Sequence, residues 1–131
     1  MKILVINGHP DKESYCQAIF QTIVETIDSN RHELKVISLN EEDFDPVLRY
    51  GYRKRMKEDS FIRRSQELIQ WAEHFIFVYP IWWSSMPSLM KGWIDRVFTP
   101  GIAYSANDQG SFIWNYLRGK QFKKLLKGKT A

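Results

Sequence analysis

Ile3-Leu4-Val5-Ile6-Asn7-Gly8-His9-Pro10 is the stretch of sequence that decides the fold. Its four consecutive apolar residues leave no polar face, which is typical of a parallel strand buried on both sides. Turn-forming residues then end the strand, and residues 14–27 follow with the apolar spacing of a helix. A buried strand that leads through a short polar loop into a helix indicates an α/β fold.

The rest of the chain repeats this alternation of strand and helix. In order, the patterns predict a strand at 34–39 with one wetter face, an irregular connection at 40–60, a helix at 61–72, a strongly β segment at 74–79 and a helix at 87–98. We therefore expect a single α/β domain over residues 1–131, built on a doubly wound parallel sheet.

Apolar spacing also predicts which helix residues face the core. In the first helix these are Ala18, Ile19, Ile23 and Ile27. In the last helix they are Leu89, Met90, Trp93, Ile94 and Val97. Proline in its first turn and the Thr99-Pro100-Gly101 stop bound that last helix.

The net charge of +4 comes from the end of the chain. Residues 1–117 carry 13 basic and 15 acidic residues, whereas residues 118–131 add six basic residues and no acid. Proteins that bind nucleic acid more often spread basic residues over a face and interleave aromatic ones. The charge pattern therefore argues against a nucleic-acid partner.

The composition also limits which classes of protein and which kinds of site are possible. No apolar run approaches the roughly 18 residues that span a bilayer, and no signal peptide is recognisable, so we expect a cytoplasmic protein that is not embedded in a membrane. The single cysteine, Cys16, excludes an internal disulfide. His32 and His74 lie far apart without flanking acids or thiols, so no metal site is expected.

Two loops are candidate ligand sites. In doubly wound sheets, ligands bind beyond the carboxyl ends of the strands, where the strand order reverses. That rule points to residues 8–16 after the first strand and to residues 80–86 after the third. Gly128-Lys129-Thr130 resembles the end of a phosphate-binding loop, but Lys123 stands where the partner glycine is needed, so it is not a nucleotide site.

The first loop has the composition of an anion site. Gly8 allows the backbone to approach a ligand, and Ser14 stands at the start of the helix, where unpaired N–H groups and partial positive charge favour a phosphate. His9 and the Ser14 hydroxyl are further donors. The alternative is that Ser14 is only an N-cap and His9 only a loop residue, and that Cys16 is a packing residue.

The second loop holds Trp82 and Trp83 side by side at the end of a strand. Successive side chains of a strand face opposite ways, so at least one indole should lie at the mouth of the sheet, where a flat aromatic ligand stacks. The alternative is that both pad the junction between strand and helix. Tyr104 is either padding or part of a pocket wall.

Together these residues resemble a family. Gly8-His9-Pro10 with Ser14, and Pro80-Ile81-Trp82-Trp83 followed by residues 87–98, are similar to the flavodoxin-like NAD(P)H:quinone oxidoreductases. That family includes bacterial quinone reductases, modulators of drug activity and ancillary subunits of potassium efflux systems. The resemblance implies a flavodoxin-like fold, a tightly bound flavin (FAD or FMN), NAD(P)H as reductant and a quinone as acceptor, with ping-pong hydride transfer through one pocket.

The resemblance also implies roles for individual residues. The phosphate end of the flavin would be held by His9, Ser14, Tyr15 and Cys16. The isoalloxazine would lie against Ile81, Trp82, Trp83 and Ser84, and Tyr104 would line the substrate side. Cys16 stands where the family usually has Asn. Members are typically homodimers whose pocket is shared between subunits.

The end of the chain departs from the family. There, the stretch resembling residues 126–131 leads into a fourth strand, a Thr-Thr-Gly-Gly-like loop over the flavin, a fifth strand and a last helix. The resemblance thus implies that the last two strands and helix are lacking, through truncation of a longer product, with an uncovered sheet edge unless a partner covers it. The alternatives are a non-catalytic module, regulatory or docked to a partner such as a membrane transporter subunit, and an inactive truncated remnant.

Overall fold

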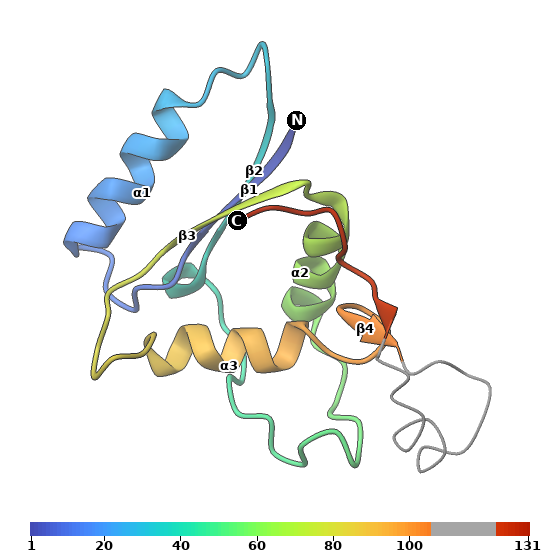
Figure 1. The fold of residues 1–131 in the computed structure, drawn as a ribbon. Coiled ribbons are helices and arrows are strands. Elements are labelled where there is room, and N and C mark those ends of the chain that lie inside the picture. The colour runs from blue at the N-terminus through green and yellow to red at the C-terminus, as the bar shows by residue number, and fades with distance from the viewer. Residues whose placement is uncertain (106–122) are drawn as a thin grey trace.

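A three-stranded parallel sheet with helices on both faces forms the centre of the molecule (Figure 1). The computed structural model describes residues 1–105 and 123–131. The elements are β1 Lys2–Asn7, α1 Tyr15–Thr26, β2 Glu33–Ser38, the 3-10 turn η1 Leu39–Glu41, α2 Ser60–Trp71, β3 His74–Val78, α3 Ser88–Val97, β4 Tyr104–Ser105 and β5 Lys123–Lys124. The three expected strands and three expected helices all form, with ends within one residue of the predicted bounds.

The sheet has the order β2-β1-β3, with all pairs parallel. Val5 of β1 stands opposite Val36 on one side and Ile76 on the other. The apolar run of β1 is therefore buried at the centre, as predicted. The expectation of a wetter strand near an edge is also confirmed, because β2 is an edge strand with Lys35 and Val36 exposed.

Helix α1 covers one face of the sheet, against Ile3 and Val5 of β1. Its contacts come from Cys16, Phe20, Ile23, Val24 and Ile27. The prediction of core residues is wrong for Ala18 and Ile19, because both side chains are exposed. The sequence allows two overlapping apolar stripes on this helix, and the stripe that buries Phe20 removes more apolar area from water.

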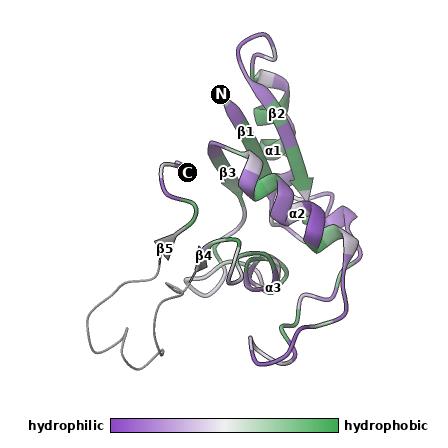
Figure 2. Cartoon of the chain, turned by 90° about the vertical axis from the view of Figure 1, so that its right-hand side faces the viewer, coloured by the Kyte–Doolittle hydropathy of each residue, from purple (hydrophilic) through white to green (hydrophobic). Residues whose placement is uncertain are grey.

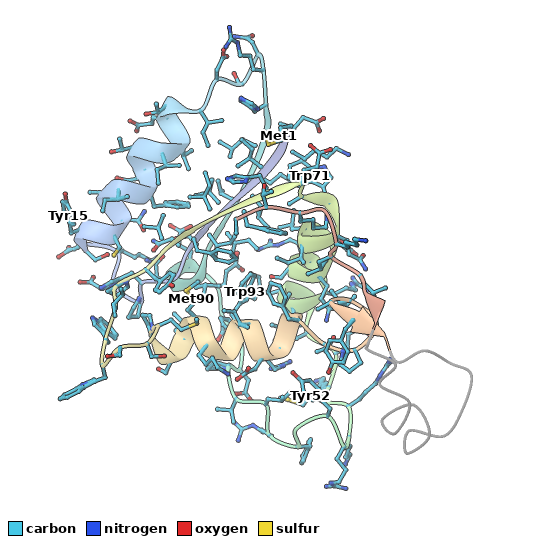
Figure 3. All side chains as sticks on the ribbon, viewed as in Figure 1. Met1, Tyr15, Tyr52, Trp71, Met90 and Trp93 are labelled. Atoms are coloured by element: carbon cyan, nitrogen blue, oxygen red, sulfur yellow. The ribbon has the colours of Figure 1, made fainter. Side chains whose placement is uncertain are left out.

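Helices α2 and α3 cover the other face, against Leu4 and Ile6 of β1 (Figures 1 and 2). Met90 and Trp93 extend from α3 toward the sheet (Figure 3), and both are buried. The Trp93 indole N–H donates to the buried Ser65 hydroxyl of α2 at 3.1 Å. The predicted inward face of α3 is confirmed.

The irregular connection after η1 is anchored on α3. Arg96 is buried and donates to the backbone oxygen of Asp45. A Cβ added to Gly92 would lie 2.3 Å from the Pro46 carbonyl oxygen, so only glycine permits this approach. The Tyr52 hydroxyl also donates to the Asp95 carbonyl at 3.3 Å. These contacts fix the connection over one side of α3.

The last residues return to the sheet. Lys129 donates to the carbonyls of Gln70, at 2.9 Å, and Ala72, at the end of α2. Thr130 then forms a parallel bridge to His74 at the start of β3. Lys129 and Thr130 of the Gly128-Lys129-Thr130 stretch thus have structural roles, holding the last residues against α2 and β3. Of the basic C-terminal residues, Arg118 and Lys120 lie outside the described residues.

Within the described ranges, no helix combines the length and apolarity that crossing a bilayer requires.

Candidate functional site

A buried polar network supports the carboxyl end of β1. Asn7 is fully buried, and its Nδ2 donates to Gln17 Oε1 at 2.6 Å and to Ser38 Oγ at 3.5 Å. Its Oδ1 accepts the His9 N–H at 3.0 Å. Asn40 closes the network by accepting from Ser38 at 2.9 Å and donating to Gln17 at 3.4 Å. One side chain therefore ties the first loop to both β2 and α1.

The first loop is held by side chains that accept from its own backbone. His9 Nδ1 accepts the Asp11 N–H at 2.9 Å, and Asp11 Oδ1 accepts the Glu13 N–H at 3.0 Å. Because Nδ1 of His9 is an acceptor here, the ring proton sits on Nε2. That N–H is left as a donor toward an incoming group.

Helix α1 begins directly after this loop. Ser14 is its N-cap and accepts the Gln17 N–H at 3.2 Å, which confirms the expected capping role. The N–H groups of Tyr15 and Cys16 lie in the first turn, where no intrahelical acceptor exists and the helix dipole is positive. Tyr15 is 82% exposed and its ring points away from the sheet (Figure 3), while Cys16 is partly buried against the core.

The second loop makes a tight turn at its tip. Trp82 and Ser85 exchange two backbone hydrogen bonds, at 2.8 and 3.0 Å. The two residues between them, Trp83 and Ser84, have φ values of 51° and 59°. This is the pattern of a type I′ turn, which usually contains Asn and Gly. No acceptor for the Trp83 and Ser84 N–H groups occurs among the described residues.

The indoles of this loop face solvent. Trp83 is 100% exposed, and Trp82 and Ile81 are also exposed. The prediction that at least one indole lies at the mouth of the sheet is confirmed. The alternative, that both pad the strand–helix junction, is wrong, because a fully exposed ring packs against nothing.

The two loops meet at one contact. The rings of His9 and Trp82 lie edge to face, with centroids 5.5 Å apart and planes at 77°. The Gly8 N–H also donates to the Val78 carbonyl at 2.8 Å, which joins the end of β1 to the end of β3. A Cβ on Gly8 would lie 2.4 Å from Met90 Sδ, so packing of α3 rather than approach of a ligand accounts for this glycine.

Tyr104 lies away from both loops. It stands in β4, which follows the C-terminal end of α3, whereas the Trp82 loop precedes the N-terminal end (Figure 1). Its neighbour is Tyr52. Partial burial raises the pKa of Tyr52, and Tyr104 and the Asp95 carboxylate raise that pKa further, against a smaller lowering by Lys91. Within one chain, the structure does not bring Tyr104 together with the other predicted site residues.

The arrangement suits a ligand with an anionic end and a flat end. The His9 Nε2–H and the first N–H groups of α1 present donors to an anion, and the helix dipole adds positive potential. Next to them, Trp82 and Trp83 offer aromatic surface, and the turn offers unpaired N–H groups to a ring edge. These donors fit the phosphate and the isoalloxazine of a flavin.

The polar network beneath the first loop is not among the features predicted from the sequence. The sequence pattern predicts Asn7 only as a turn residue and gives no role to Gln17, Ser38 or Asn40. Asn directly after four buried apolar residues is a usable signal, because a polar side chain at that point must find partners in the interior. The partners themselves are not local in sequence.

Comparison with known proteins identifies the family. A family model described as flavodoxin-like fold matches residues 1–130. The chain belongs to this flavodoxin-like family. It is 27% identical over 139 residues to a mouse (Mus musculus) ribosyldihydronicotinamide dehydrogenase (quinone), covering 91% of the chain and 59% of that relative. It is 29% identical over 132 residues to an uncharacterized NAD(P)H oxidoreductase of Haemophilus influenzae, covering 96% and 63%.

Solved structures agree with this assignment. The NAD(P)H:quinone oxidoreductase from Methanothermobacter marburgensis superposes with a TM-score of 0.69 at 26% identity, over 85% of this chain and 60% of that one. The flavodoxin-like chain therefore spans roughly three-fifths of the length of these relatives. The expected fold class is confirmed over the described residues.

Proposed function

We propose that this chain binds a flavin across its two loops and serves the two-electron reduction of quinones by NAD(P)H in the cytoplasm. The observation that carries the proposal is the His9–Trp82 contact, which joins the anion donors of the first loop to the exposed aromatic surface of the second. Similarity to relatives named quinone-dependent dehydrogenase and NAD(P)H oxidoreductase supports the reaction class.

Each residue has a defined task in this proposal. The His9 Nε2–H, the Ser14 hydroxyl and the N–H groups of Tyr15 and Cys16 hold the flavin phosphate. Ile81, Trp82, Trp83 and Ser84 lie against the isoalloxazine, which the turn's N–H groups orient. When bound, the flavin supplies hydride transfer between NAD(P)H and the quinone; the protein binds, orients and excludes water.

A second copy of the chain would complete the pocket. The indole surface is open, and one chain keeps Tyr104 at the other end of α3 from it. In a homodimer with shared pockets, Tyr104 of each protomer lines the substrate side of its partner's site. This accounts for a substrate-side residue that lies far from the flavin loops of its own chain.

The visible absorption spectrum of the purified chain, read together with its intact mass, tests flavin binding. We expect flavin absorption as isolated, or its appearance as a bound spectrum on adding FMN or FAD, and then NAD(P)H oxidation that depends on added quinone. Trp83→Ala should weaken flavin binding, whereas Tyr50→Ala, an exposed aromatic outside the two loops, should not. A chain that binds neither flavin is not this enzyme.

A partner-binding module without catalysis is the second candidate. The open side of β3 in the described sheet favours it. Flavin binding with no quinone-dependent NAD(P)H oxidation, together with capture of a defined partner such as a membrane transporter subunit, would support this function over the first.

A further inference from the structure

The irregular connection between η1 and α2 carries a concentrated positive charge. Residues 47–57, called here the basic segment, hold five basic residues and no acid. One of the five, Arg49, pairs with Asp45 at 2.6 Å. The other four are exposed and form no ion pair within residues 1–105 and 123–131. These four cations are Arg53, Lys54, Arg55 and Lys57.

The fold presents this segment at the surface on a fixed support. In both ribbon views the connection extends beyond α3, on the side of the helix away from the sheet (Figures 1 and 2). Its start is held where Arg96 donates to the Asp45 carbonyl. Its end is held where the Asp59 carboxylate accepts the N–H groups of Phe61 and Ile62, at 2.9 and 3.2 Å. Because both ends are anchored, a partner binds the segment at a reduced cost in chain entropy.

Exposed apolar and aromatic side chains accompany the four cations. Val47 and Tyr50 are both exposed. The Lys54 ammonium lies 5.1 Å from the centre of the Tyr50 ring, which is a cation–π contact. Tyrosine and lysine each combine an apolar body with a polar end, and such residues are typical of the boundary between a bilayer and water.

We infer that the basic segment is a contact surface for an anionic phospholipid bilayer. The four cations attract the negative headgroups, and Val47 and Tyr50 lie at headgroup depth. Charge complementarity supports this occupant, because side chains without fixed ionic partners attract a plane of mobile anions in any register. The inference does not depend on flavin chemistry.

Other occupants fit the segment less well. Nucleic-acid recognition uses open aromatic faces and amide side chains, but Lys54 covers one face of Tyr50 and the segment contains no Asn or Gln. A specific protein site uses side chains held in place, and no hydrogen bond to another described residue holds the four cations. Two copies of the segment facing each other would repel.

Sedimentation with phospholipid vesicles tests the inference. We expect the 131-residue chain to sediment with vesicles made of about equal parts of phosphatidylserine and phosphatidylcholine, and not with phosphatidylcholine alone. Binding should weaken as salt rises from about 0.1 M to about 1 M, because the Debye length falls from about 10 Å to about 3 Å. Equal binding to the two kinds of vesicle overturns the inference.

A matched pair of variants separates the segment from the net charge. Each basic residue near an anionic surface raises the partition coefficient about fivefold, so Lys54→Gln/Arg55→Gln should lower it about 25-fold. Arg31→Gln/Lys127→Gln removes the same charge from exposed positions outside the segment and should leave the partition coefficient nearly unchanged. An equal loss in both double variants overturns the inference, since net charge alone then drives binding.

Limited digestion with trypsin locates the contact. Cleavage after residues 53–55 should slow on the anionic vesicles, while cleavage after Arg31 should not change. Protection of residues 53–55 by self-association without vesicles overturns the inference, because the occupant is then a second copy. Tighter binding to poly(U) than to the vesicles at equal phosphate concentration also overturns it, in favour of nucleic acid.

The proposed flavin site can be tested separately. Tyr50→Ala should weaken vesicle binding and leave flavin binding unchanged. Trp83→Ala should weaken flavin binding and leave vesicle binding unchanged. Loss of vesicle binding in Trp83→Ala, with normal binding in Lys54→Gln/Arg55→Gln, would place the lipid contact at the second loop and overturns the inference.

Discussion

Trp83 and Ser84 hold a backbone conformation that favours glycine, and Ser84 allows the cost to be measured. A non-glycine residue with positive φ is strained by about 1–3 kcal/mol, against which glycine loses about 0.5–1 kcal/mol through chain entropy. We expect Ser84→Gly to raise the free energy of unfolding by about 0.5–1 kcal/mol in urea denaturation. Ser85→Gly, at a position without positive φ, should not raise it. An unchanged midpoint for Ser84→Gly would mean that the turn is unstrained.

Asn7 gives the second test at this scale. Replacing it with Leu removes partners of the His9 N–H and of Gln17 Oε1, so we expect a loss of about 1–3 kcal/mol. Urea denaturation measures the loss, and faster hydrogen exchange at the His9 amide would locate it in the first loop. Asn30→Leu, at an exposed position, is the control. A stability equal to that of the control would show that the network does not hold the loop.

At the scale of elements, the contact between α3 and the 40–60 connection depends on Gly92. Gly92→Ala forces a Cβ against the Pro46 carbonyl, and backbone cannot move aside as a flexible side chain does. We expect destabilisation of about 1–3 kcal/mol, the usual cost of overpacking. Ser88→Ala, exposed on the same helix, should change stability little. Calorimetric unfolding of both variants checks this, and equal melting temperatures would contradict the close approach.

Tyr52 links the same connection to α3 and β4. Its raised pKa leads us to expect that the stability of the fold depends on pH. Its pKa is raised above the ordinary value of about 10. The folded state therefore holds the phenolic proton more tightly than the unfolded state. This contribution is fully present below about pH 10 and is lost as the pH rises through the raised pKa. Urea midpoints at alkaline pH should fall less for Tyr52→Phe than for the original chain, with Tyr50→Phe as control.

The sequence predicted those elements whose signals are local. Apolar runs and Gly, Pro and Asx residues bounded β1, α2 and α3 closely, because each signal lies within the element it bounds. The exposed face of α1 was assigned wrongly, since the burial of Phe20 is decided by the sheet. The two-residue strands β4 and β5 exist only through their pairing, which joins positions 105 and 123, 18 positions apart in the sequence, and neither strand has a local signal.

In the candidate site, too, the features with local signals were predictable and those that depend on distant contacts were not. Its two loops followed from the strand-end rule, and Ser14 from the capping pattern. Asn7 and Ser38 meet across 31 positions, so their hydrogen bond had no signature within either segment. The position of Tyr104 beyond α3 likewise depends on where the helix ends in space, which spacing alone does not define.

At the scale of the whole molecule, flavin binding should increase the free energy of unfolding. A ligand that binds only the folded chain stabilises it by about 2.7 kcal/mol at one hundred times its dissociation constant. The melting temperature should therefore rise with the concentration of FMN or FAD, whichever binds. Trp83→Ala should reduce the rise without lowering the melting temperature of the ligand-free chain, because Trp83 is fully exposed. A melting temperature independent of both flavins would argue against a flavin site.

The contact between His9 and Trp82 joins two segments that are 73 positions apart in the sequence. A change in the size or shape of either ring alters the packing surface of the other ring. In related sequences these two positions should therefore vary together rather than independently. For the same reason, grafting the first loop alone onto another doubly wound scaffold would transfer a loop without its support, whereas a graft of both loops carries the contact with it.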